Sequence, residues 1–247
     1  LIFATYDSNI IDQQLLQHFC KEDYPPSTMT WLASARGCMA TNTDNPGSAT
    51  KTLLLAYHSA LETGQIRQAI IMACNSADSF ASLGDLDAAL ELDERALVLA
   101  QSVNWPCVIG FSLLQTANVL RLLGRLDDAK NNLLKALEVM ANLNHMHSYM
   151  MAMLYLGEVS LDLNDTGAAL SYFQQVETLT SALRDVYYLL RSWRGQANAL
   201  GRLGQPQEAI VKAAQALTVA QQLGNVDDQI QVLRVFAELH HLYTLPA

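Results

Sequence analysis

Small residues recur at intervals of 40 positions along this chain of 247 residues, and this recurrence constrains the fold more than any other feature. In the stretch from Ala117 to Ala136, Gly124 stands seven positions after the first alanine, and Ala129 follows it. Glycine readily adopts the left-handed backbone conformation that ends a helix. The stretch therefore predicts a helical hairpin, with one helix ending at Gly124 and a second beginning directly after it.

When the chain is aligned to itself at a spacing of 40 residues, small residues and turn residues recur in several columns at once, which a chance match would not produce. The small column on the first helix holds Gly37, Ala77, Ala117, Gly157, Ala197 and Ala237, and the turn column holds Asp44, Gly84, Gly124, Asn164 and Gly204. The second helix carries two small columns, one with Ala49, Ala89, Ala129, Ala169 and Ala209 and one with Ala56, Ala96, Ala136, Val176 and Ala216. Side chains this small let crossing helices approach closely. The columns therefore predict hairpins that stack on one another.

The phase of the columns predicts where each helix lies. First helices are expected at about 26–43, 66–83, 106–123, 146–163, 186–203 and 226–243, and second helices at about 47–63, 86–103, 126–143, 166–183 and 206–223. Asp85 and Asp165 are expected to cap second helices, and Asp185 and Asn225 to cap first helices.

The predicted fold class is all-α, a right-handed α-solenoid of about five and a half hairpins. Residues 1–24 are interpreted as an N-terminal helix that ends a degenerate preceding repeat. The solenoid then occupies residues 25–247, in units near 25–64, 65–104, 105–144, 145–184 and 185–224 and a partial unit at 225–247.

These columns resemble the signature of the tetratricopeptide repeat (TPR) family, which places small residues on both helices of a hairpin and a glycine between them. The resemblance covers nearly all of residues 25–243, although the unit has 40 residues here and roughly 34 in the usual repeat. The extra length is similar to a long-helix subgroup found in bacterial signalling proteins and peptide-sensing regulators. The aromatic residue expected before the turn is present only as Phe80, and the proline that often ends the unit is missing. The resemblance implies a concave groove, lined by first helices, that binds a protein or peptide.

Composition excludes several classes of partner and site. Apolar residues make up 51% of the chain and charged residues 16%, which suits helices buried between neighbours on two sides. The net charge of -9 argues against binding to nucleic acid or to an anionic membrane. The widely spaced cysteines Cys20, Cys38, Cys74 and Cys107 are interpreted as buried thiols in a reducing compartment, so a cytoplasmic location is expected.

No nucleophile motif, phosphate-binding loop, nucleotide-binding motif or paired-carboxylate arrangement is present. The chain is therefore predicted not to be an enzyme and to need no cofactor, although an attached domain could be an enzyme. The pairs His145 with His147 and His240 with His241 lack a third ligand in the sequence, so no metal site is predicted either.

One column of the first helices is polar although its helical neighbours are mostly apolar. It lies six positions before the turn and holds Cys38, Asp78, Asn118, Glu158, Asn198 and Glu238. A polar residue held at one position across stacked helices faces either a ligand or water. Both interpretations remain open.

Arginines gather near this column in the C-terminal half. Guanidinium groups bind carboxylates through two parallel hydrogen bonds, so several arginines on one wall could hold an acidic segment of a partner. The residues predicted to line the groove are Asn118, Arg121, Glu158, Arg191, Arg194, Asn198, Arg202 and Arg234. The alternative is that the arginines pair with Glu158, Asp162 and Glu238 inside the solenoid. In the N-terminal half, Trp31, Ile71, Phe111 and Met151 could bind an apolar segment if exposed, or could belong to the core.

Two functions from different classes remain. The chain could be a scaffold that binds a peptide or a partner protein in its groove. It could instead be the sensory or dimerising arm of a larger bacterial signalling protein, such as a diguanylate cyclase or a transcriptional regulator. The sixth first helix has no second helix after it, so its outer face is expected to be covered by the next unit, another copy or a downstream domain, and a homodimer through the end helices would satisfy it.

Overall fold

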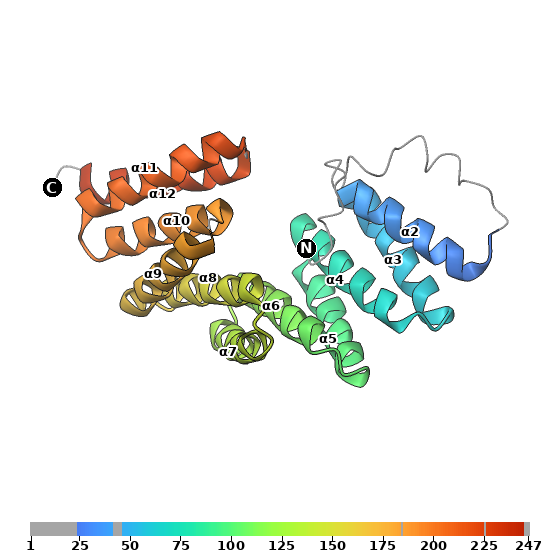
Figure 1. The fold of residues 1–247 in the computed structure, drawn as a ribbon. Helices are drawn as coiled ribbons and strands as arrows, with labels where there is room; N and C mark the ends of the chain where they lie inside the picture. The colour runs from blue at the N-terminus through green and yellow to red at the C-terminus, as the bar shows by residue number, and fades with distance from the viewer. Residues whose placement is uncertain (1–23, 42–45, 184, 225, 245–247) are drawn as a thin grey trace. The chain divides into compact units, whose positions relative to one another are not determined.

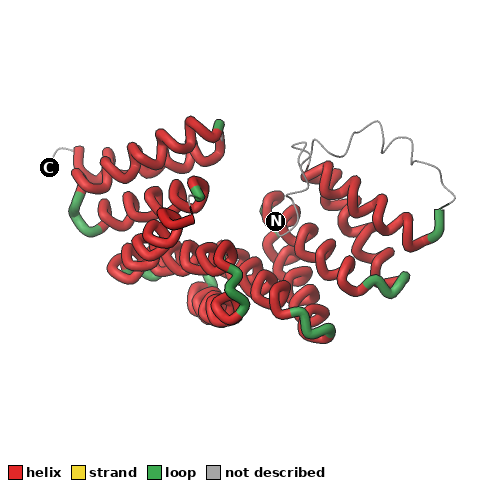
Figure 2. The backbone as a smooth tube through the Cα atoms, viewed as in Figure 1, coloured by secondary structure: helices red, strands yellow, loops and turns green. Residues whose placement is uncertain are grey.

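The computed structural model describes residues 24–41, 46–183, 185–224 and 226–244. Within these ranges all the regular secondary structure is helical (Figure 2). The expected N-terminal helix, Asp44 and Asn225 lie outside the described residues.

Helices alternate along the chain in the predicted phase. First helices are α2 (Pro26–Thr41), α4 (Ile66–Leu83), α6 (Pro106–Leu122), α8 (Met146–Asp162), α10 (Val186–Arg202) and α12 (Val226–Thr244). Second helices are α3 (Pro46–Glu62), α5 (Leu86–Ser102), α7 (Leu126–Asn142), α9 (Thr166–Leu183) and α11 (Pro206–Leu223). The predicted helix positions are thus confirmed to within two residues at each described boundary.

The turn column has the backbone conformation that the sequence predicts. Gly84 has φ = 82°, and its amide donates to the carbonyl of Ala81. Asn164 has φ = 60°, which asparagine tolerates better than most other residues. Each turn ends one helix and lets the next begin within two residues.

Aspartates cap three of the helices, as predicted. The side chain of Asp85 accepts from the amide of Ala88 at the start of α5, and that of Asp165 accepts from Ala168 at the start of α9. Asp185 does the same for Tyr187 at the start of α10. These caps satisfy amides that have no partner within the helix.

The described residues fall into two compact units, divided after residue 125. In the first unit, each of α2 to α5 packs on the helix that follows it, and α4 also contacts α2 and α6 (Figure 1). In the second unit, each of α7 to α11 packs on the next helix, and α10 also contacts α8 and α12. In each unit, first helices therefore lie side by side in one layer.

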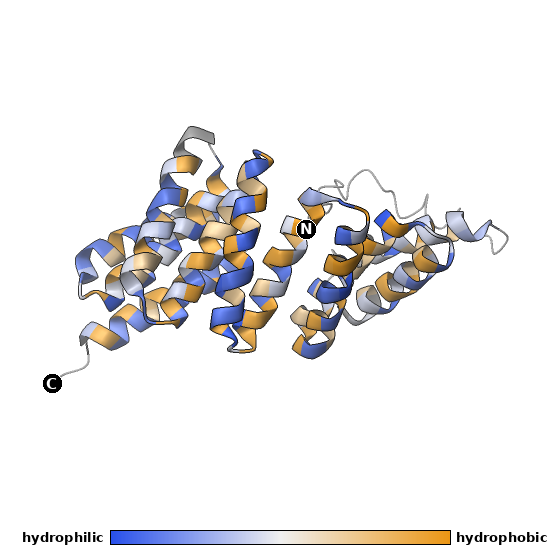
Figure 3. Ribbon diagram, turned by 90° about the horizontal axis from the view of Figure 1, so that it is seen from below, coloured by the Kyte–Doolittle hydropathy of each residue, from blue (hydrophilic) through white to orange (hydrophobic). Residues whose placement is uncertain are grey.

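The described helices carry both hydrophobic and hydrophilic residues (Figure 3), and these are most clearly separated onto different sides in α7 and α10. The small columns of the second helices face the core, because Ala89, Ala129, Ala169 and Ala209 are fully buried. None of the described helices is both long and apolar enough to cross a membrane.

The tightest packing in the second unit surrounds Phe173 of α9. Its side chain is only 1% exposed, and its ring faces Gly157 of α8 and Gly195 of α10. A Cβ atom added at Gly157 would lie 2.6 Å from the ring, and one added at Gly195 would lie still closer. The same relation recurs in the first unit, where Leu53 of α3 faces Gly37 of α2. A large side chain on a second helix therefore fits where the first helix has no side chain.

We expect the Gly157→Ala substitution to lower the free energy of unfolding by about 1–2 kcal/mol. The added methyl group overlaps a buried aromatic ring, and such overpacking costs up to about 3 kcal/mol, against a gain of about 1 kcal/mol from alanine's helix propensity. Gly167→Ala is the matched control, since Gly167 of α9 has open space around it. It should raise stability slightly in the same urea titration. Equal effects of the two substitutions would contradict this account of the packing.

Candidate functional site

The layer of first helices in the second unit presents one face built from residues three or four positions apart. Residues at this spacing lie on the same side of a helix. The face comprises Tyr155 and Glu158 of α8, Arg191, Asn198 and Arg202 of α10, and Glu238 of α12, and we call it the inner wall.

Ion pairs join the three helices at the inner wall. Arg191 Nη2 lies 3.2 Å from Glu158 Oε1, and Arg194 Nη2 lies 3.5 Å from the same oxygen. On its other side, Arg194 Nη1 lies 4.0 Å from Asp228 Oδ1 of α12. Glu158 thus forms ion pairs with two arginines. Arg194, which lies on α10, links α8 to α12 through its contacts with Glu158 and Asp228.

Burial shapes the electrostatics of this cluster, whose four side chains are between 11% and 20% exposed. Burial alone would lower the pKa of the Arg191 guanidinium, but Glu158 raises it above its usual range. Arg194 differs, because burial and the neighbouring charge of Arg191 hold the pKa of its guanidinium below the ordinary value. The surroundings therefore favour the charged form of Arg191 more than that of Arg194.

Aromatic rings complete the surroundings of Arg191. Its guanidinium carbon lies 5.4 Å from the centre of the Tyr155 ring and 6.0 Å from that of Tyr187. Cations over aromatic faces at these distances are stabilised by the ring quadrupole. The charge of Arg191 is therefore stabilised within the protein by the Glu158 carboxylate and by two aromatic rings.

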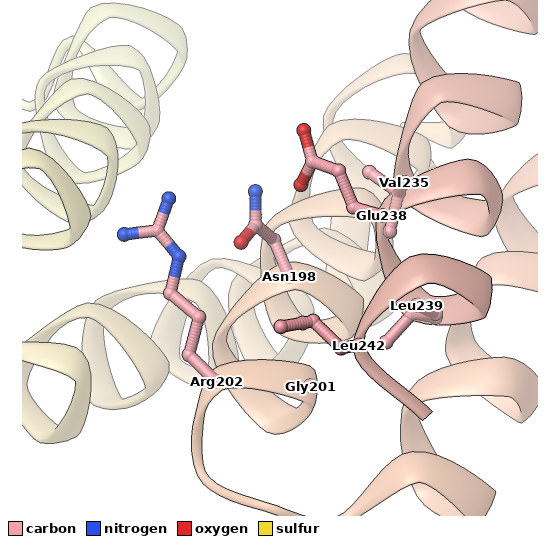
Figure 4. A pocket seen from close by; sticks show the side chains of 7 residues that line it. All are labelled: Asn198, Gly201, Arg202, Val235, Glu238, Leu239 and Leu242. Carbon is pink, nitrogen blue, oxygen red and sulfur yellow. The ribbon is translucent and has the colours of Figure 1, made fainter. Parts of the chain in front are cut away.

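A pocket opens at the C-terminal end of α10, where it meets α12. Figure 4 shows the side chains of Asn198, Arg202 and Glu238 projecting to the same side, with Leu242 beside them. Gly201, Val235 and Leu239 complete the lining. The pocket therefore combines a cation, an anion and a carboxamide with an apolar base.

The polar groups of the pocket keep much of their hydrogen-bonding capacity. Arg202 Nη1 donates to the backbone carbonyl of Leu161 at 2.7 Å, which anchors the guanidinium and leaves most of its N–H groups available. Within the part of the chain that the structure describes, the Asn198 carboxamide has no hydrogen-bond partner. Arg202 and Glu238 are both exposed. This pocket, rather than the Arg191 cluster, has groups free to bind a ligand.

Of the eight residues predicted for the groove, the structure brings Glu158, Arg191 and Arg194 together in one cluster, and Asn198 and Arg202 together in the pocket. Arg234 lies on α12, exposed to solvent and without an ion-pair partner among the described residues. Asn118 and Arg121 lie on α6, in the first unit, so they are described apart from the other six. In that unit Phe111 is buried in the core, whereas Trp31 is 59% exposed.

The internal pairing that the sequence offered as an alternative describes Arg191 and Arg194, because both contact Glu158. The sequence did not predict that Arg194 has a second carboxylate partner. Asp228 was expected only to stabilise the first turn of its helix, and the structure also places it against Arg194. No periodic signal marked it, because its column holds Tyr188 and Ser148 in the two preceding first helices.

A second polar network, missed from the sequence, supports α10 from behind. Glu177 of α9 accepts hydrogen bonds from Lys212 Nζ at 2.8 Å and from Trp193 Nε1 and Gln196 Nε2 at 2.7 Å. Burial raises the pKa of the Glu177 carboxyl, but these donors outweigh burial and hold it below its usual value. The network fixes α9, α10 and α11 to one another and so orients the helix that carries Asn198.

The first unit contains buried acidic groups in its core. Asp93 of α5 is 1% exposed and its Oδ1 has no hydrogen-bond partner. It occupies the column that holds Leu53, Leu133 and Phe173 in other second helices. Burial, with a contribution from Asp78, raises the pKa of the Asp93 carboxyl well above its usual value. Burial also raises the pKa of the nearby Cys74 thiol to about 12, which makes it a poor nucleophile at neutral pH.

Neither unit shows a metal-binding arrangement in its described part, because no group of three or more histidine, cysteine or acidic side chains is placed to hold an ion there.

No protein-family model matches the chain, and no curated protein sequence is similar to it. Solved structures do share its fold. A protein from Podosopora anserina, described as a kinesin light chain with nearly identical TPR-like repeats, is 17% identical and has a TM-score of 0.61, with 82% of this chain and 100% of that one covered.

Two Rap proteins are also similar in structure. A Rap protein complexed with Competence and Sporulation Factor has a TM-score of 0.77 at 13% identity, covering 94% of this chain and 68% of that one. The Rap conjugation gene regulator of the plasmid pLS20, in complex with the Phr* peptide, has a TM-score of 0.73 at 15% identity, covering 96% and 71%. The chain therefore has the all-α solenoid fold of TPR-like repeat proteins, as its sequence columns predict. The long-helix subgroup and the right-handed sense stay predictions.

We expect Glu158→Gln to lower the free energy of unfolding by about 2 kcal/mol, between the small cost of losing an exposed pair and the large cost of losing a buried one. The substitution leaves Arg191 without its carboxylate and Arg194 with only Asp228. Glu91→Gln is the control, because the Glu91–Arg95 pair is more than half exposed, and its loss should cost at most about 0.5 kcal/mol. Denaturant unfolding of both variants would test this, and a control as damaging as Glu158→Gln would contradict it.

We expect Asp93→Asn to raise the free energy of unfolding at pH 7. The pKa of Asp93 is raised in the folded state, so folding favours the protonated carboxyl. The wild type has its full free energy of unfolding below the pKa of an unfolded aspartate, about 3.9. It loses part of that free energy as pH rises from there toward the folded-state pKa of Asp93. The asparagine variant should therefore gain most at neutral pH, and its advantage should shrink as pH falls toward about 4. Asp87→Asn, an exposed change in the same helix, should show no such gain. Denaturant unfolding of the wild type and both variants at a series of pH values would measure this. An advantage of Asp93→Asn that grows as pH falls would contradict the account.

Proposed function

We propose that this chain is a protein-interaction scaffold that holds an extended peptide segment of a partner protein in the pocket between α10 and α12. The observation that carries the proposal is the Asn198 carboxamide, which lines the pocket without an intramolecular partner among the described residues. A carboxamide offers a donor and an acceptor side by side. It therefore matches the N–H and C=O groups of an extended peptide backbone, whatever side chains the peptide carries.

Arg202 and Glu238 supply selectivity on either side of Asn198. The Arg202 guanidinium is anchored through one nitrogen and is exposed, so its other N–H groups can grip a carboxylate. Leu242, which is 57% exposed, offers apolar contact to a neighbouring side chain. We infer that the preferred segment has an acidic residue next to an apolar one.

The acidic preference rests on Arg202 rather than on Arg191 and Arg194. Glu158 contacts both of those arginines and Asp228 contacts Arg194, so two carboxylates balance two guanidinium charges. Binding a partner carboxylate there would have to break existing pairs between groups already removed from water. Arg202 forms no ion pair among the described residues, so its guanidinium can bind a carboxylate of an acidic segment without breaking one.

The comparisons support a peptide as the ligand. Both Rap structures were solved with a bound factor or peptide, and their fold is shared over most of this chain. A second candidate, favoured by the same likeness to a conjugation gene regulator, is a sensory arm whose bound peptide alters an attached or partner protein. For both functions we propose a cytoplasmic location, because the described cysteines Cys74 and Cys107 are free thiols.

We expect selection from a displayed peptide library to enrich sequences that pair an acidic with an apolar residue. Asn198→Ala should weaken binding of every selected peptide by roughly tenfold, since it removes contacts to the backbone. Arg202→Glu should weaken the acidic peptides by more, because it turns an attraction into a repulsion. Titration calorimetry with the purified variants would measure both effects.

The matched control is Arg95→Glu, a charge reversal at an exposed arginine on α5 of the first unit. It changes the net charge as Arg202→Glu does and should leave peptide binding unchanged. A library that enriches nothing, or peptides that bind the Asn198 and Arg202 variants as tightly as the wild type, would contradict the proposed function.

A further inference from the structure

One face of α12 is exposed although the equivalent face of earlier first helices is covered. Ile230 is 43% exposed and Leu233 is 52% exposed, and Ala237 is also exposed. Forty positions earlier on α10, Leu190 and Ala197 are fully buried and Trp193 is half-buried. On α8 the corresponding residues Met150, Met153 and Gly157 are all buried.

The second helix of each hairpin covers this face in α8 and α10. Phe173 of α9 packs against Gly157, and Ala209, Ala213 and Ala216 of α11 join the core cluster that contains Ala197. No described helix follows α12. The exposed stripe, which we call the end face, consists of Val226, Ile230, Leu233 and Ala237, spaced by four, three and four positions along one side of the helix.

We propose that the end face binds a second copy of this chain, with the two α12 helices packed antiparallel about a two-fold axis at Leu233. The second helix of a hairpin runs antiparallel to the first, so an antiparallel helix is the shape that the end face accommodates in the other repeats. In an isologous contact each copy uses the same patch. Leu233 then meets the partner's Leu233, and Ile230 lies opposite the partner's Ala237, so a large residue faces a small one.

Charge favours a copy of the same helix in this orientation. The first turn of α12 carries Asp227 and Asp228, whereas its cationic or imidazole side chains, Arg234, His240 and His241, lie in its C-terminal half. An antiparallel pair places Asp227 on the same flank as the partner's His241, in the last turn, and does so twice because of the two-fold axis. A parallel pair would bring the acidic turns together. The antiparallel arrangement also sets the two helix dipoles in opposite directions, which is favourable.

The proposal does not depend on peptide binding, because the end face and the inner wall lie on different sides of α12. Ile230 and Leu233 belong to the end face, which a second helix would cover, whereas Glu238 lines the pocket together with Asn198. Other occupants of the end face, such as a following helix of a longer chain or an unrelated protein, would leave this chain monomeric when purified alone.

Sedimentation velocity of the full chain over a range of concentrations tests the proposal. The wild type should sediment as two copies at high concentration. Leu233→Asp should raise the dissociation constant of the dimer by roughly a hundredfold, since two carboxylates would meet at the axis in an apolar contact. Val98→Asp is the matched control, because Val98 of α5 is 63% exposed and lies in the first unit. It should leave the dimer intact.

Disulfide crosslinking tests the register without relying on a disruptive change. Leu233→Cys should crosslink to itself under mild oxidation, as the axis requires. Ile230→Cys alone should not crosslink, but its mixture with Ala237→Cys should, beyond the background of the wild type with its four cysteines. A wild type that stays monomeric at every concentration would overturn the proposal, as would a dimer that survives Leu233→Asp or crosslinks only through other positions.

Discussion

The close approach of helices around small residues is the constraint on which the rest of this structure depends. Phe173 enters the space left by Gly157 and Gly195, so one side chain of α9 sets the positions of both α8 and α10. All of the inner wall except Glu238 is carried by those same two helices. The contact between Glu158 and Arg191 therefore exists because a ring on the opposite side of the layer holds their backbones at a fixed spacing. Steric fit in the core comes first, and the electrostatics of the wall follow from it.

The charges of the inner wall show why its most conspicuous arginines are poor ligand-binding groups. Arg191 and Arg194 are largely buried, and a buried cation is tolerated only when it is paired. Glu158, Asp228 and the rings of Tyr155 and Tyr187 meet that requirement within the protein. Capacity for a ligand is left at the end of α10, where Arg202 is held by a backbone carbonyl and Asn198 has no such partner. The structural role and the proposed recognition role are thus divided along one helix, between its middle and its C-terminal turn.

Backbone features were predictable from the sequence, and the pairing of long side chains was not. Helix positions, the left-handed turn at Asn164 and the cap at Asp185 depend on local steric and hydrogen-bonding rules that recur every 40 residues, so the columns reveal them. The contact of Arg194 with Asp228 depends on which rotamers two flexible side chains adopt on neighbouring helices, and no column records that choice. Asp93 marks a middle case. Its column is apolar in the other second helices, so the sequence could have identified it as an exception, but only the structure shows an unpartnered carboxylate oxygen in the core.

The last helix, α12, takes part in the core, in an ion pair and in the pocket. Val235 and Leu239 pack into the core cluster of the second unit, Asp228 pairs with Arg194, and Glu238 forms one side of the pocket. A helix packed on one side opens more readily than a helix packed on two, because fewer buried apolar contacts must be broken. The side of the pocket formed by α12 is therefore the least stable part of the proposed binding site. If the proposed second copy covers Ile230 and Leu233, it restrains the helix that carries Glu238, and occupancy of the end face would then be linked to affinity at the proposed binding site through the local stability of α12.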